Sequence, residues 1–291
     1  MKSPDKRAKN QPGGIAHSDL DDRGERIQKI LAQLGLGSRR QIESWIAEGR
    51  IKVNGQVARL GDRLYETDEL ILNGRTIDLL TRRAQATRVL VYYKPVGEVV
   101  TRRDPEARPV IFTQLPKLNL GRWIAVGRLD INTQGLLLVT NNGELANRLM
   151  HPSRRIEREY AVRVLGRVAD EVLQRMRKGV LLDDGLARFE DIQAGGGEGA
   201  NHWYKVVLTE GRNRIVRRLW ESQGITISRL IRVRYGQVSL PVKLKPRTFY
   251  ELNDQERAVL MESVGIQDDH PEPRANPSCA DSRRAPRRKN Q

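Results

Sequence analysis

A single carboxylate, Asp130, stands in a polar loop between two apolar segments. The loop runs Gly127-Arg128-Leu129-Asp130-Ile131-Asn132-Thr133-Gln134-Gly135, with a glycine at each end. It joins residues 124–126 to residues 136–139, which have the composition of short buried strands. A loop held between two rigid strands can aim a side chain at a ligand. Asp130 is therefore the first candidate for a residue that does chemistry.

Two other interpretations fit the same loop. An Asp that leaves a strand and precedes Asn, Thr and Gly often serves only as a turn or cap residue that bonds its own backbone. The spacing of Asp130, Asn132 and Gly135 also resembles the start of a calcium loop. However, the twelfth position of that loop is Asn141 where Glu is needed, and a leucine-rich strand follows where a helix is needed. We set calcium aside and keep the turn as the alternative.

Other residue types that carry chemistry are sparse. The four histidines are scattered along the chain: His17, His151, His202 and His270. The one cysteine, Cys279, stands in a proline-rich tail, so neither disulfides nor a metal site nor a histidine-based nucleophilic triad is indicated. The glycine-rich stretch 194–200 lacks the flanking strand, helix and Lys-Ser or Lys-Thr of a phosphate loop. We interpret it as a surface loop and expect no metal and no cofactor.

Charge points to the class of partner. The 291 residues include 52 Lys and Arg against 36 Asp and Glu, a formal net charge of +16. Such an excess favours a polyanion, with nucleic acid ahead of a membrane surface. No apolar stretch is long enough to span a bilayer and the N-terminus has no secretory signal, so we expect no membrane association and a cytoplasmic location.

Four arginines crowd a second segment, Glu210-Gly211-Arg212-Asn213-Arg214-Ile215-Val216-Arg217-Arg218-Leu219. They surround the start of a predicted helix. A guanidinium keeps its charge and can bind a carboxylate or a phosphate through two parallel hydrogen bonds. The segment could hold a catalytic Asp in its ionised form or make an edge that faces RNA, and both can hold at once.

The elements before residue 87 predict a small basic unit. Residues 1–24 have no periodicity and are predicted to be disordered. Ile27, Ile30, Leu31 and Leu34 follow helix spacing, and Ser38 has capping-box spacing ahead of a second helix. Asn54-Gly55 marks a hairpin. We expect a unit with two helices and a small sheet over 25–86, including a polar linker at its end.

The motifs Arg-Ile-x-Lys-Ile-Leu, Ser-Arg-Arg and Gly-Arg-Ile-x-Val-Asn-Gly in this unit resemble the S4 RNA-binding domain. The resemblance implies that Ser38, Arg39 and Arg40 face RNA phosphates, as cations at the start of a helix can. Arg50 belongs to the same predicted basic face.

Strand and helix patterns alternate over residues 87–265. We expect strands at 89–93, 124–126, 136–140, 160–164, 203–208 and 225–233, and helices at 145–150, 168–178, 215–222 and 252–264. The alternation predicts an α+β domain with a mixed sheet. Residues 266–291 are too polar to fold; this basic tail could bind RNA as a mobile arm or serve solubility alone.

The order of motifs resembles the RsuA/RluB family of ribosomal RNA pseudouridine synthases over roughly residues 25–255. The motifs are the S4-like unit, Lys94-Pro95-x-Gly97, Gly127-Arg128-Leu129-Asp130, Glu159-Tyr160, and Gly211-Arg212-Asn213-Arg214-x-Val216-Arg217-Arg218. The resemblance implies an S4-like domain followed by a largely antiparallel catalytic sheet. The Gly-Arg-Asn-Arg form resembles the RluB branch, which acts on 23S rRNA, although Ile215 stands where a polar residue is expected.

The resemblance also implies roles for single residues. Asp130 is then the catalytic carboxylate that converts a flipped uridine to pseudouridine without a cofactor, by attack on the sugar or on the base. Tyr160 would stack on the uracil and Arg217 would pair with Asp130. Arg128 would act as a wedge or phosphate contact, and Lys94 would support loop geometry or bind RNA backbone.

Arg212, Arg214 and Arg218 complete the set of expected RNA contacts. Two rival functions stay open: a 16S rRNA synthase, and a non-catalytic RNA-binding factor in ribosome assembly. A third function, that of an S4-bearing RNA methyltransferase, is disfavoured because this sequence lacks the glycine-rich loop that would bind the cofactor. The identity of the target nucleotide is also open. So is the question whether the substrate is free rRNA or an assembling large ribosomal subunit. We expect the protein to be a monomer.

Overall fold

The computed structural model describes residues 24–79, 86–197 and 199–267. The N-terminal segment 1–24 and the basic tail 266–291 lie almost wholly outside these residues, as does most of the predicted linker. The chain divides into two units. The first comprises residues up to 85 together with 116–123, and the second comprises 86–115 and everything after 123. Each is described by itself.

The first unit places two helices against a small antiparallel sheet. The helices are α1 (Ile27–Gln33) and α2 (Arg39–Ala47). The sheet has the order β3 (Gln56–Val57), β2 (Ile51–Val53), β5 (Leu70–Leu72) and β6 (Arg75–Ile77), and β1 (Glu25–Arg26) pairs separately with β4 (Arg63–Leu64). The helices bury the apolar positions that their spacing predicted, among them Ile27, Leu31 and Ile42.

Two local signals in this unit are confirmed. The Ser38 hydroxyl accepts a hydrogen bond from the backbone N–H of Gln41 at 3.1 Å, and the Gln41 side chain caps the Ser38 N–H in return. Asn54 and Gly55 both have positive φ, 50° and 80°, as the tight hairpin turn between β2 and β3 requires. Sequence alone therefore positions the start of α2 and the hairpin.

Residues 116–123 belong to the first unit, although the sequence-based division had placed them in the second domain. Leu120 packs against the helical core of the first unit, and the Trp123 indole N–H donates to the carbonyl oxygen of Pro116 at 2.7 Å. Gly35 lies so close to Gly121 that a Cβ on Gly35 would sit 2.6 Å from the Gly121 carbonyl oxygen. A side chain at residue 35 would separate this segment from α1.

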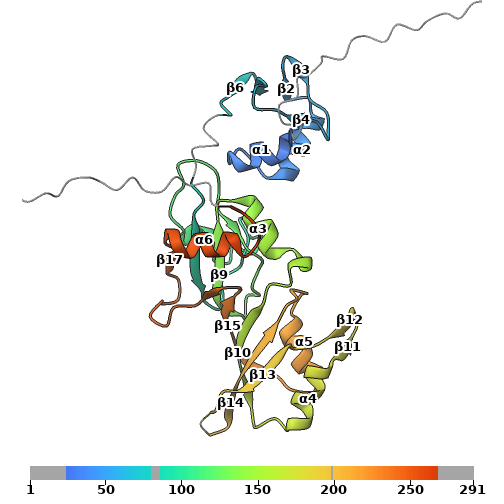
Figure 1. Cartoon of the computed structure of the whole chain (residues 1–291), viewed down its shortest axis with the longest axis vertical. Helices are drawn as coiled ribbons and strands as arrows, with labels where there is room; N and C mark the ends of the chain where they lie inside the picture. The colour runs from blue at the N-terminus through green and yellow to red at the C-terminus, as the bar shows by residue number, and fades with distance from the viewer. Residues whose placement is uncertain (1–23, 80–85, 198, 268–291) are drawn as a thin grey trace, which may run out of the picture. The chain divides into compact units, whose positions relative to one another are not determined.

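The second unit is built on a nine-stranded sheet (Figure 1). Its main path runs β13 (Asp191–Ala194), β14 (Asn201–Leu208), β10 (Arg158–Leu165), β15 (Ile227–Tyr235), β9 (Gln134–Thr140), β7 (Val89–Lys94) and β17 (Phe249–Glu251). β16 (Val238–Ser239) pairs with β15, and β8 (Ile124–Ala125) pairs with β9. Every pair is antiparallel except β9 with β15. The predicted α+β fold with a mixed, largely antiparallel sheet is therefore confirmed.

Helices cover one face of each half of this sheet. α3 (Gly143–Met150) and α6 (Asp254–Glu262) bury apolar side chains against β7 and β9 (Figure 1). Near β13 and β14 lie α4 (Asp170–Lys178) and α5 (Ile215–Glu221), where the Trp220 ring centroid is 5.3 Å from that of Tyr204. The four predicted helices all form. The β11–β12 hairpin (Val180–Leu182, Gly185–Ala187) and strands β13 and β17 had not been predicted.

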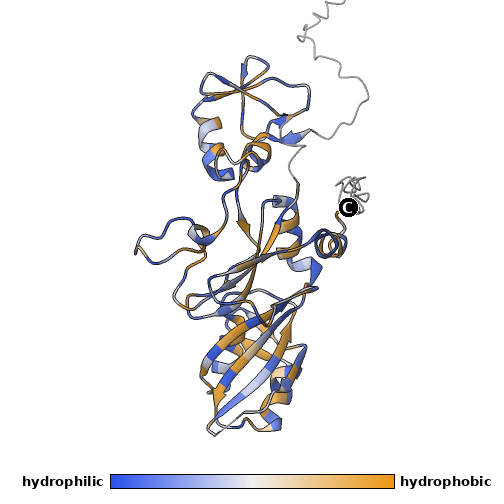
Figure 2. Cartoon of the chain, turned by 90° about the vertical axis from the view of Figure 1, so that its left-hand side faces the viewer, coloured by the Kyte–Doolittle hydropathy of each residue, from blue (hydrophilic) through white to orange (hydrophobic). Residues whose placement is uncertain are grey.

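Strand β10 shows the alternation expected of a strand with one buried face, whereas β7 and β9 are buried at almost every residue. Figure 2 shows apolar and polar segments in turn along strands of the second unit. On β10 the residues Arg158, Tyr160, Val162 and Val164 are all buried. Because every second side chain of a strand lies on the same face, Arg158 points inward with the apolar residues. No helix within the described residues is long and apolar enough to cross a bilayer.

The parallel pairing of β9 with β15 depends on one glycine. Gly135 lies opposite Arg232 across β9 and β15. Its φ is 107°, and a Cβ there would lie 2.3 Å from the Arg232 carbonyl oxygen. Only glycine permits this approach, which brings the end of the Asp130 loop against β15.

Candidate active site

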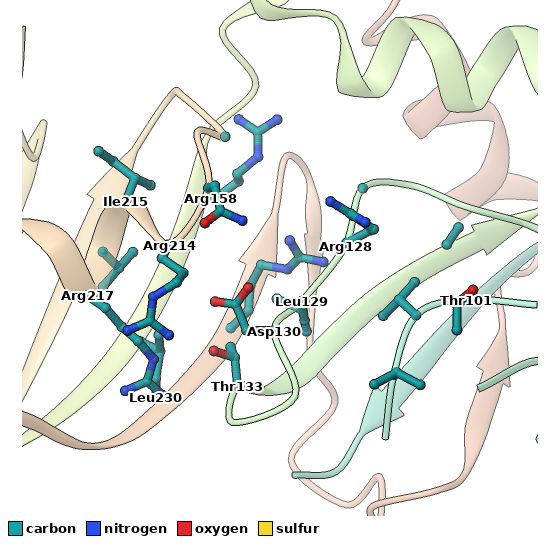
Figure 3. A pocket seen from close by; sticks show the side chains of 18 of the residues that line it. Thr101, Arg128, Leu129, Asp130, Thr133, Arg158, Arg214, Ile215, Arg217 and Leu230 are labelled. Carbon is teal, nitrogen blue, oxygen red and sulfur yellow. The ribbon is translucent and has the colours of Figure 1, made fainter. Parts of the chain in front are cut away.

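A cavity of about 1000 Å³ lies in the second unit. Its walls come from residues 99–112, the Asp130 loop, β10, β15 and the segment that enters α5. In Figure 3, Asp130 stands beside Thr133, with Arg128, Arg158, Arg214 and Arg217 placed around the same space. Within the described ranges no three His, Cys, Asp or Glu residues are grouped so that they could hold a metal ion. The carboxylate thus faces cations contributed by several elements.

Lys94 holds the Asp130 loop from the protein interior. It is the last residue of β7 and is fully buried. Its ammonium group donates hydrogen bonds to the backbone oxygens of Asp130 at 3.0 Å and Thr133 at 2.8 Å, and to that of Pro95 at 3.0 Å. These bonds use the three donors of an ammonium ion. Lys94 therefore fixes the two ends of the turn that carries Asp130.

The two carbonyl groups between these ends are bound as well. The Gly97 N–H donates to the Ile131 oxygen at 2.9 Å, and the Nη2 atom of Arg217 donates to the Asn132 oxygen at 2.9 Å. Four consecutive carbonyl groups of the loop, residues 130–133, each accept a hydrogen bond from another segment. The backbone of the loop is consequently held in place while the Asp130 side chain remains available in the cavity.

Burial of Lys94 has an electrostatic consequence. Removal from water lowers the pKa of the ammonium group to about 8, although the nearby carboxylates of Glu98 and Asp130 act in the opposite direction. The RNA contact that the sequence had suggested for Lys94 is wrong, because a fully buried side chain bonded to three carbonyl oxygens cannot reach an RNA backbone. Its other predicted part, support of loop geometry, agrees with these contacts.

The buried carboxylate of Glu98 anchors the residues that follow Lys94. Glu98 is 1% exposed and accepts hydrogen bonds from the Tyr92 hydroxyl at 2.7 Å and from Arg247 Nε at 3.1 Å. Burial, followed by this bond to Glu98, raises the pKa of the Tyr92 hydroxyl, which therefore stays a donor. The residues that follow Lys94 are thus anchored to β7, which keeps Gly97 next to the Asp130 loop.

Arg217 binds the Asp130 loop through its backbone. Besides the bond to Asn132, its Nη1 atom donates to the Ile227 oxygen at 3.4 Å, and its Nε atom is buried without a partner in the described structure. The ion pair predicted between Arg217 and Asp130 is not present among the described residues. Both side chains line the same cavity, and Arg217 binds the backbone of the loop instead. Burial, and then the charge of Arg214, lower the pKa of Arg217, while Asp130 acts to raise it.

The structure brings the predicted active-site residues to one cavity. Tyr160 is 8% exposed on the inner face of β10 and lines the cavity with Asp130 and Arg217. Arg128 is exposed at its edge. Residues far apart in the sequence therefore share one space, which is the arrangement that their predicted roles need.

Two of the predicted RNA contacts are occupied within the protein. Arg212 bonds to Glu210 and to the carboxylate of Asp184, the latter at 2.9 Å. Arg218 binds the same Asp184 through two hydrogen bonds of 2.6 and 2.8 Å. Arg218, and then Arg212, lower the pKa of Asp184 to about 2. These contacts tie the β11–β12 hairpin to α5 and do not support the RNA contact predicted for either arginine.

Arg214 remains a candidate for RNA contact. It is exposed on the cavity wall in a left-handed conformation (φ 49°), and one Nη atom lies 3.2 Å from Glu221. The next residue, Ile215, is buried, which explains why an apolar side chain is accepted at this position.

The predicted RNA-binding residues of the first unit lie at the start of α2. Ser38, Arg39 and Arg40 are exposed, and the two arginines have no hydrogen-bond or ion-pair partner among the described residues. Arg50 donates to Asn73 and Glu48, and its guanidinium lies 5.1 Å from the Trp45 ring centroid. Arg39 and Arg40 are therefore more available to a phosphate than Arg50 is.

Sequence reasoning missed two buried arginines of the cavity wall, Arg158 and Arg232. They are 8% and 2% exposed. Arg158 could have been found from its position two residues before Tyr160, which places both side chains on the inner face of β10. Arg232 likewise lies on the same inner face of β15 as Leu230. Neither was distinguished from the outward-facing arginines of the same strands.

Two family models match the chain. The model described as RNA pseudouridylate synthase matches residues 88–222, and the model described as S4 domain matches residues 25–70. The first match contains Asp130, Tyr160 and Arg217, and the second contains Ser38, Arg39 and Arg40.

Curated relatives are similar over most of the chain. The ribosomal large subunit pseudouridine synthase B of Pseudomonas aeruginosa is 57% identical over 245 residues, which are 84% of this chain and 64% of that protein. The protein of the same name from Haemophilus influenzae is 55% identical, over 89% of this chain and 71% of that protein. The one from Escherichia coli K12 is 55% identical, over 83% of this chain and 84% of that protein. The chain thus spans somewhat less than two thirds of the first relative and more of the others.

A solved structure shares the fold. The crystal structure of a pseudouridylate synthase superposes with a TM-score of 0.56 at 23% identity, and covers 82% of this chain and 99% of that one. This likeness concerns the arrangement of strands and helices.

Proposed function

Because this chain belongs to the RNA pseudouridylate synthase family, we propose that it isomerises a uridine of ribosomal RNA to pseudouridine. The relatives named above carry the large ribosomal subunit in their names, so the proposed substrate is 23S rRNA. The proposed place of action is the cytoplasm, and the proposed active form is a monomer.

The reaction rearranges bonds without net oxidation or reduction. The bond between N1 of uracil and C1′ of ribose breaks, the uracil turns, and C5 joins C1′. The proton on C5 leaves and N1 regains a proton, so the atoms balance without a cofactor. An ionised carboxylate can assist by covalent attack on the sugar or the base, or by stabilising positive charge at C1′. We assign this part to Asp130 and leave the choice of path open.

The observation that carries the proposal is the way the Asp130 loop is held. Its four carbonyl groups, residues 130–133, are bound by Lys94, Gly97 and Arg217. A backbone fixed in this way keeps the carboxylate oriented before substrate arrives, which is a condition for efficient catalysis. A turn residue with no other function would satisfy its own backbone and would not need three external donors.

A uridine must leave its base stack to reach Asp130. Tyr160 offers an aromatic face to the flipped uracil, and its hydroxyl could take part in proton transfer at C5. Arg128, exposed beside Asp130, is suited to contact a phosphate or to occupy the space that the base vacates. Arg217 acts by positioning the loop through Asn132.

RNA binding is assigned to cations of both units. Arg39 and Arg40 of the first unit and Arg128 and Arg214 of the second are exposed. Contacts to phosphate supply affinity without reading the sequence. The target uridine would then be selected by the shape of the RNA around it.

The test is tritium release from rRNA transcripts labelled at C5 of uracil. The wild-type chain should release tritium from 23S and not from 16S transcripts. Asp130→Asn should abolish release while RNA affinity changes only a few fold, because one charge is altered on a large basic surface. Asp170→Asn, an exposed acid on α4 outside the cavity, is the matched control and should behave as the wild type.

Each other outcome has its own meaning. Full release by Asp130→Asn contradicts the role of this carboxylate. Release from 16S instead indicates a small-subunit synthase. Tight RNA binding with no release, from transcripts or from assembling subunits, indicates a non-catalytic binding factor.

A further inference from the structure

We propose that Arg232 and Arg158 form a phosphate-binding site in the cavity wall, which holds the RNA backbone next to the flipped uridine. This inference rests on the proposed function, because RNA is taken to be the ligand. It assigns a task to two buried cations that the roles described above leave unused.

Arg232 is buried, oriented and incompletely bonded. Its Nε atom donates to the Leu136 carbonyl oxygen at 2.8 Å, and its guanidinium lies 5.0 Å from the ring centroid of Tyr235. Its Nη2 atom is buried and has no partner among the described residues. A buried donor without an acceptor is unfavourable, so a ligand that brings an acceptor to this atom would be bound more tightly.

Arg158 approaches the same tyrosine. Its guanidinium is also 5.0 Å from the Tyr235 ring centroid, and its Nη2 atom donates to the Tyr235 hydroxyl at 3.2 Å. Tyr235 is fixed in turn, because its hydroxyl donates to the Leu149 carbonyl oxygen at 2.8 Å. The Nη1 atom of Arg158 also donates to the carbonyl oxygens of Ile156 at 2.8 Å and Thr209 at 3.0 Å. These bonds and the Tyr235 ring hold the two guanidinium groups in one wall of the cavity.

These two cations lack acidic partners. No ion pair joins Arg158 or Arg232 to a carboxylate among the described residues, whereas the neighbouring Arg234 pairs with both Glu157 and Glu159. Arginines are rarely this buried without a counter-charge. Two carboxylates line the cavity. Asp104 pairs with Arg108, and Asp130 cannot balance Arg158, Arg232 and Arg217 together. The cavity consequently carries a surplus of positive charge that an anionic ligand would neutralise.

A phosphate satisfies the charge as well as the hydrogen bond. A uracil carbonyl oxygen could accept from Arg232 Nη2, but it is neutral and would leave the two cations uncompensated. A phosphate brings negative charge and several acceptor oxygens, which suit guanidinium donors.

The strand register places this site next to the reacting base. Arg232 is the direct cross-strand partner of Tyr160 on β10 and of Gly135 on β9. It therefore lies between the aromatic ring proposed to stack on uracil and the end of the Asp130 loop. The phosphates nearest to this position in a bound RNA are those that flank the target nucleotide.

The first experiment measures RNA affinity over a range of salt concentrations. It compares the wild-type chain with Arg232→Gln and Arg232→Lys, using 23S transcripts. Loss of one phosphate contact should lower the slope of log K against log salt by about one for Arg232→Gln, and Arg232→Lys should keep most of it. Arg175→Gln on α4, which removes one exposed charge outside the cavity, is the matched control. An unchanged slope in Arg232→Gln would overturn the proposal.

The second experiment alters the RNA and leaves the protein intact. In a substrate RNA, each phosphate near the target uridine is replaced in turn by an uncharged methylphosphonate, and kcat/KM is measured by tritium release. One flanking position should cost the wild type about ten- to a hundredfold. The same replacement should cost Arg232→Gln much less, because the contact is already gone. Equal losses in both proteins at every position would refute the site.

The two experiments distinguish a failure of the phosphate-binding site from a failure of the proposed function. If the wild type releases no tritium, the proposed function fails, but the salt dependence still decides whether Arg232 contacts phosphate. Arg232→Gln also loses the bond to Leu136, so its thermal unfolding is compared with that of the wild type. The methylphosphonate losses of the wild-type protein do not depend on that variant being folded; no loss at any flanking position would itself contradict the proposal.

Discussion

The Lys94 ammonium group lies 3.0 Å from the backbone carbonyl oxygen of Asp130. The buried cation thus holds the acidic residue through the main chain and leaves the carboxylate itself available. Because the same group also bonds the Thr133 oxygen, the geometry of the loop depends on the number of protons that Lys94 carries. A neutral amine has two donors where the ammonium ion has three.

We expect activity to fall as the pH rises through about 8, where the buried Lys94 loses its proton. The pKa of Lys94 in the folded chain is below its ordinary value of 10.5. Between these values the unfolded chain binds more protons than the folded chain, so this residue makes the free energy of unfolding increase with pH. Activity and stability should therefore change in opposite directions between about pH 8 and 10.5.

The measurements are a pH–rate profile and denaturant unfolding at matched pH values. Lys94→Met removes the titrating group, so both changes should be absent from this variant, whose activity should be low throughout because three carbonyl oxygens lose their donor. A wild-type rate that stays constant up to pH 10 would show that deprotonation of Lys94 does not disturb the loop.

Gly135→Ala should strongly destabilise the second unit. The new Cβ would lie 2.3 Å from the Arg232 carbonyl oxygen at a φ of 107°, so β9 and β15 would have to separate. We expect a loss of about 2–4 kcal/mol in the free energy of unfolding. Gly166→Ala is the control, because Gly166 also has positive φ (77°) but no atom within 4 Å of its Cβ position. It should lose only about 1 kcal/mol. Equal losses would mean that backbone strain, not contact with β15, decides the effect.

Local patterns predicted the elements but not the long-range pairing. Helix spacing identified α1 and α2, and the capping box located the start of α2, because these signals act within a few residues. The parallel contact of Gly135 with Arg232 joins segments almost a hundred residues apart. A glycine at the end of a loop has the same appearance whether it serves a turn or a close approach of two strands.

The candidate site, too, could be predicted from the sequence only where local patterns reveal it. Asp130 could be singled out because it is a lone carboxylate in a polar loop between strands. The burial of Lys94 could not, since a lysine at the end of a strand usually faces solvent. Arg212 and Arg218 were expected to contact RNA, but their partner Asp184 lies on a hairpin that the sequence had not revealed. Charge alone does not tell a structural arginine from one that binds RNA.

Arg217→Ala should reduce turnover more than RNA affinity. The substitution removes the donor that holds the Asn132 oxygen, so the loop next to Asp130 should shift. Because small misplacements of reacting groups are costly, we expect kcat to fall by about a hundredfold. Arg214→Ala, in the same segment but exposed, should instead weaken RNA binding with a smaller change in kcat. Single-turnover kinetics and filter binding distinguish the two patterns. Unchanged kcat in Arg217→Ala would remove it as a positioning residue.

Ser38 can be tested for two separate tasks, because its hydroxyl caps α2 while the residue is exposed where RNA phosphates are expected. Ser38→Ala loses the cap and should lower the stability of the first unit by about 1 kcal/mol. Ser38→Asp keeps a capping oxygen and places a negative charge at the helix N-terminus, so stability should be retained. The same charge repels phosphate, so Ser38→Asp should bind RNA more weakly than Ser38→Ala does. Thermal unfolding and filter binding at low salt measure the two effects. Equal RNA affinity in the two variants would mean that Ser38 serves the helix only and that the RNA surface begins at Arg39.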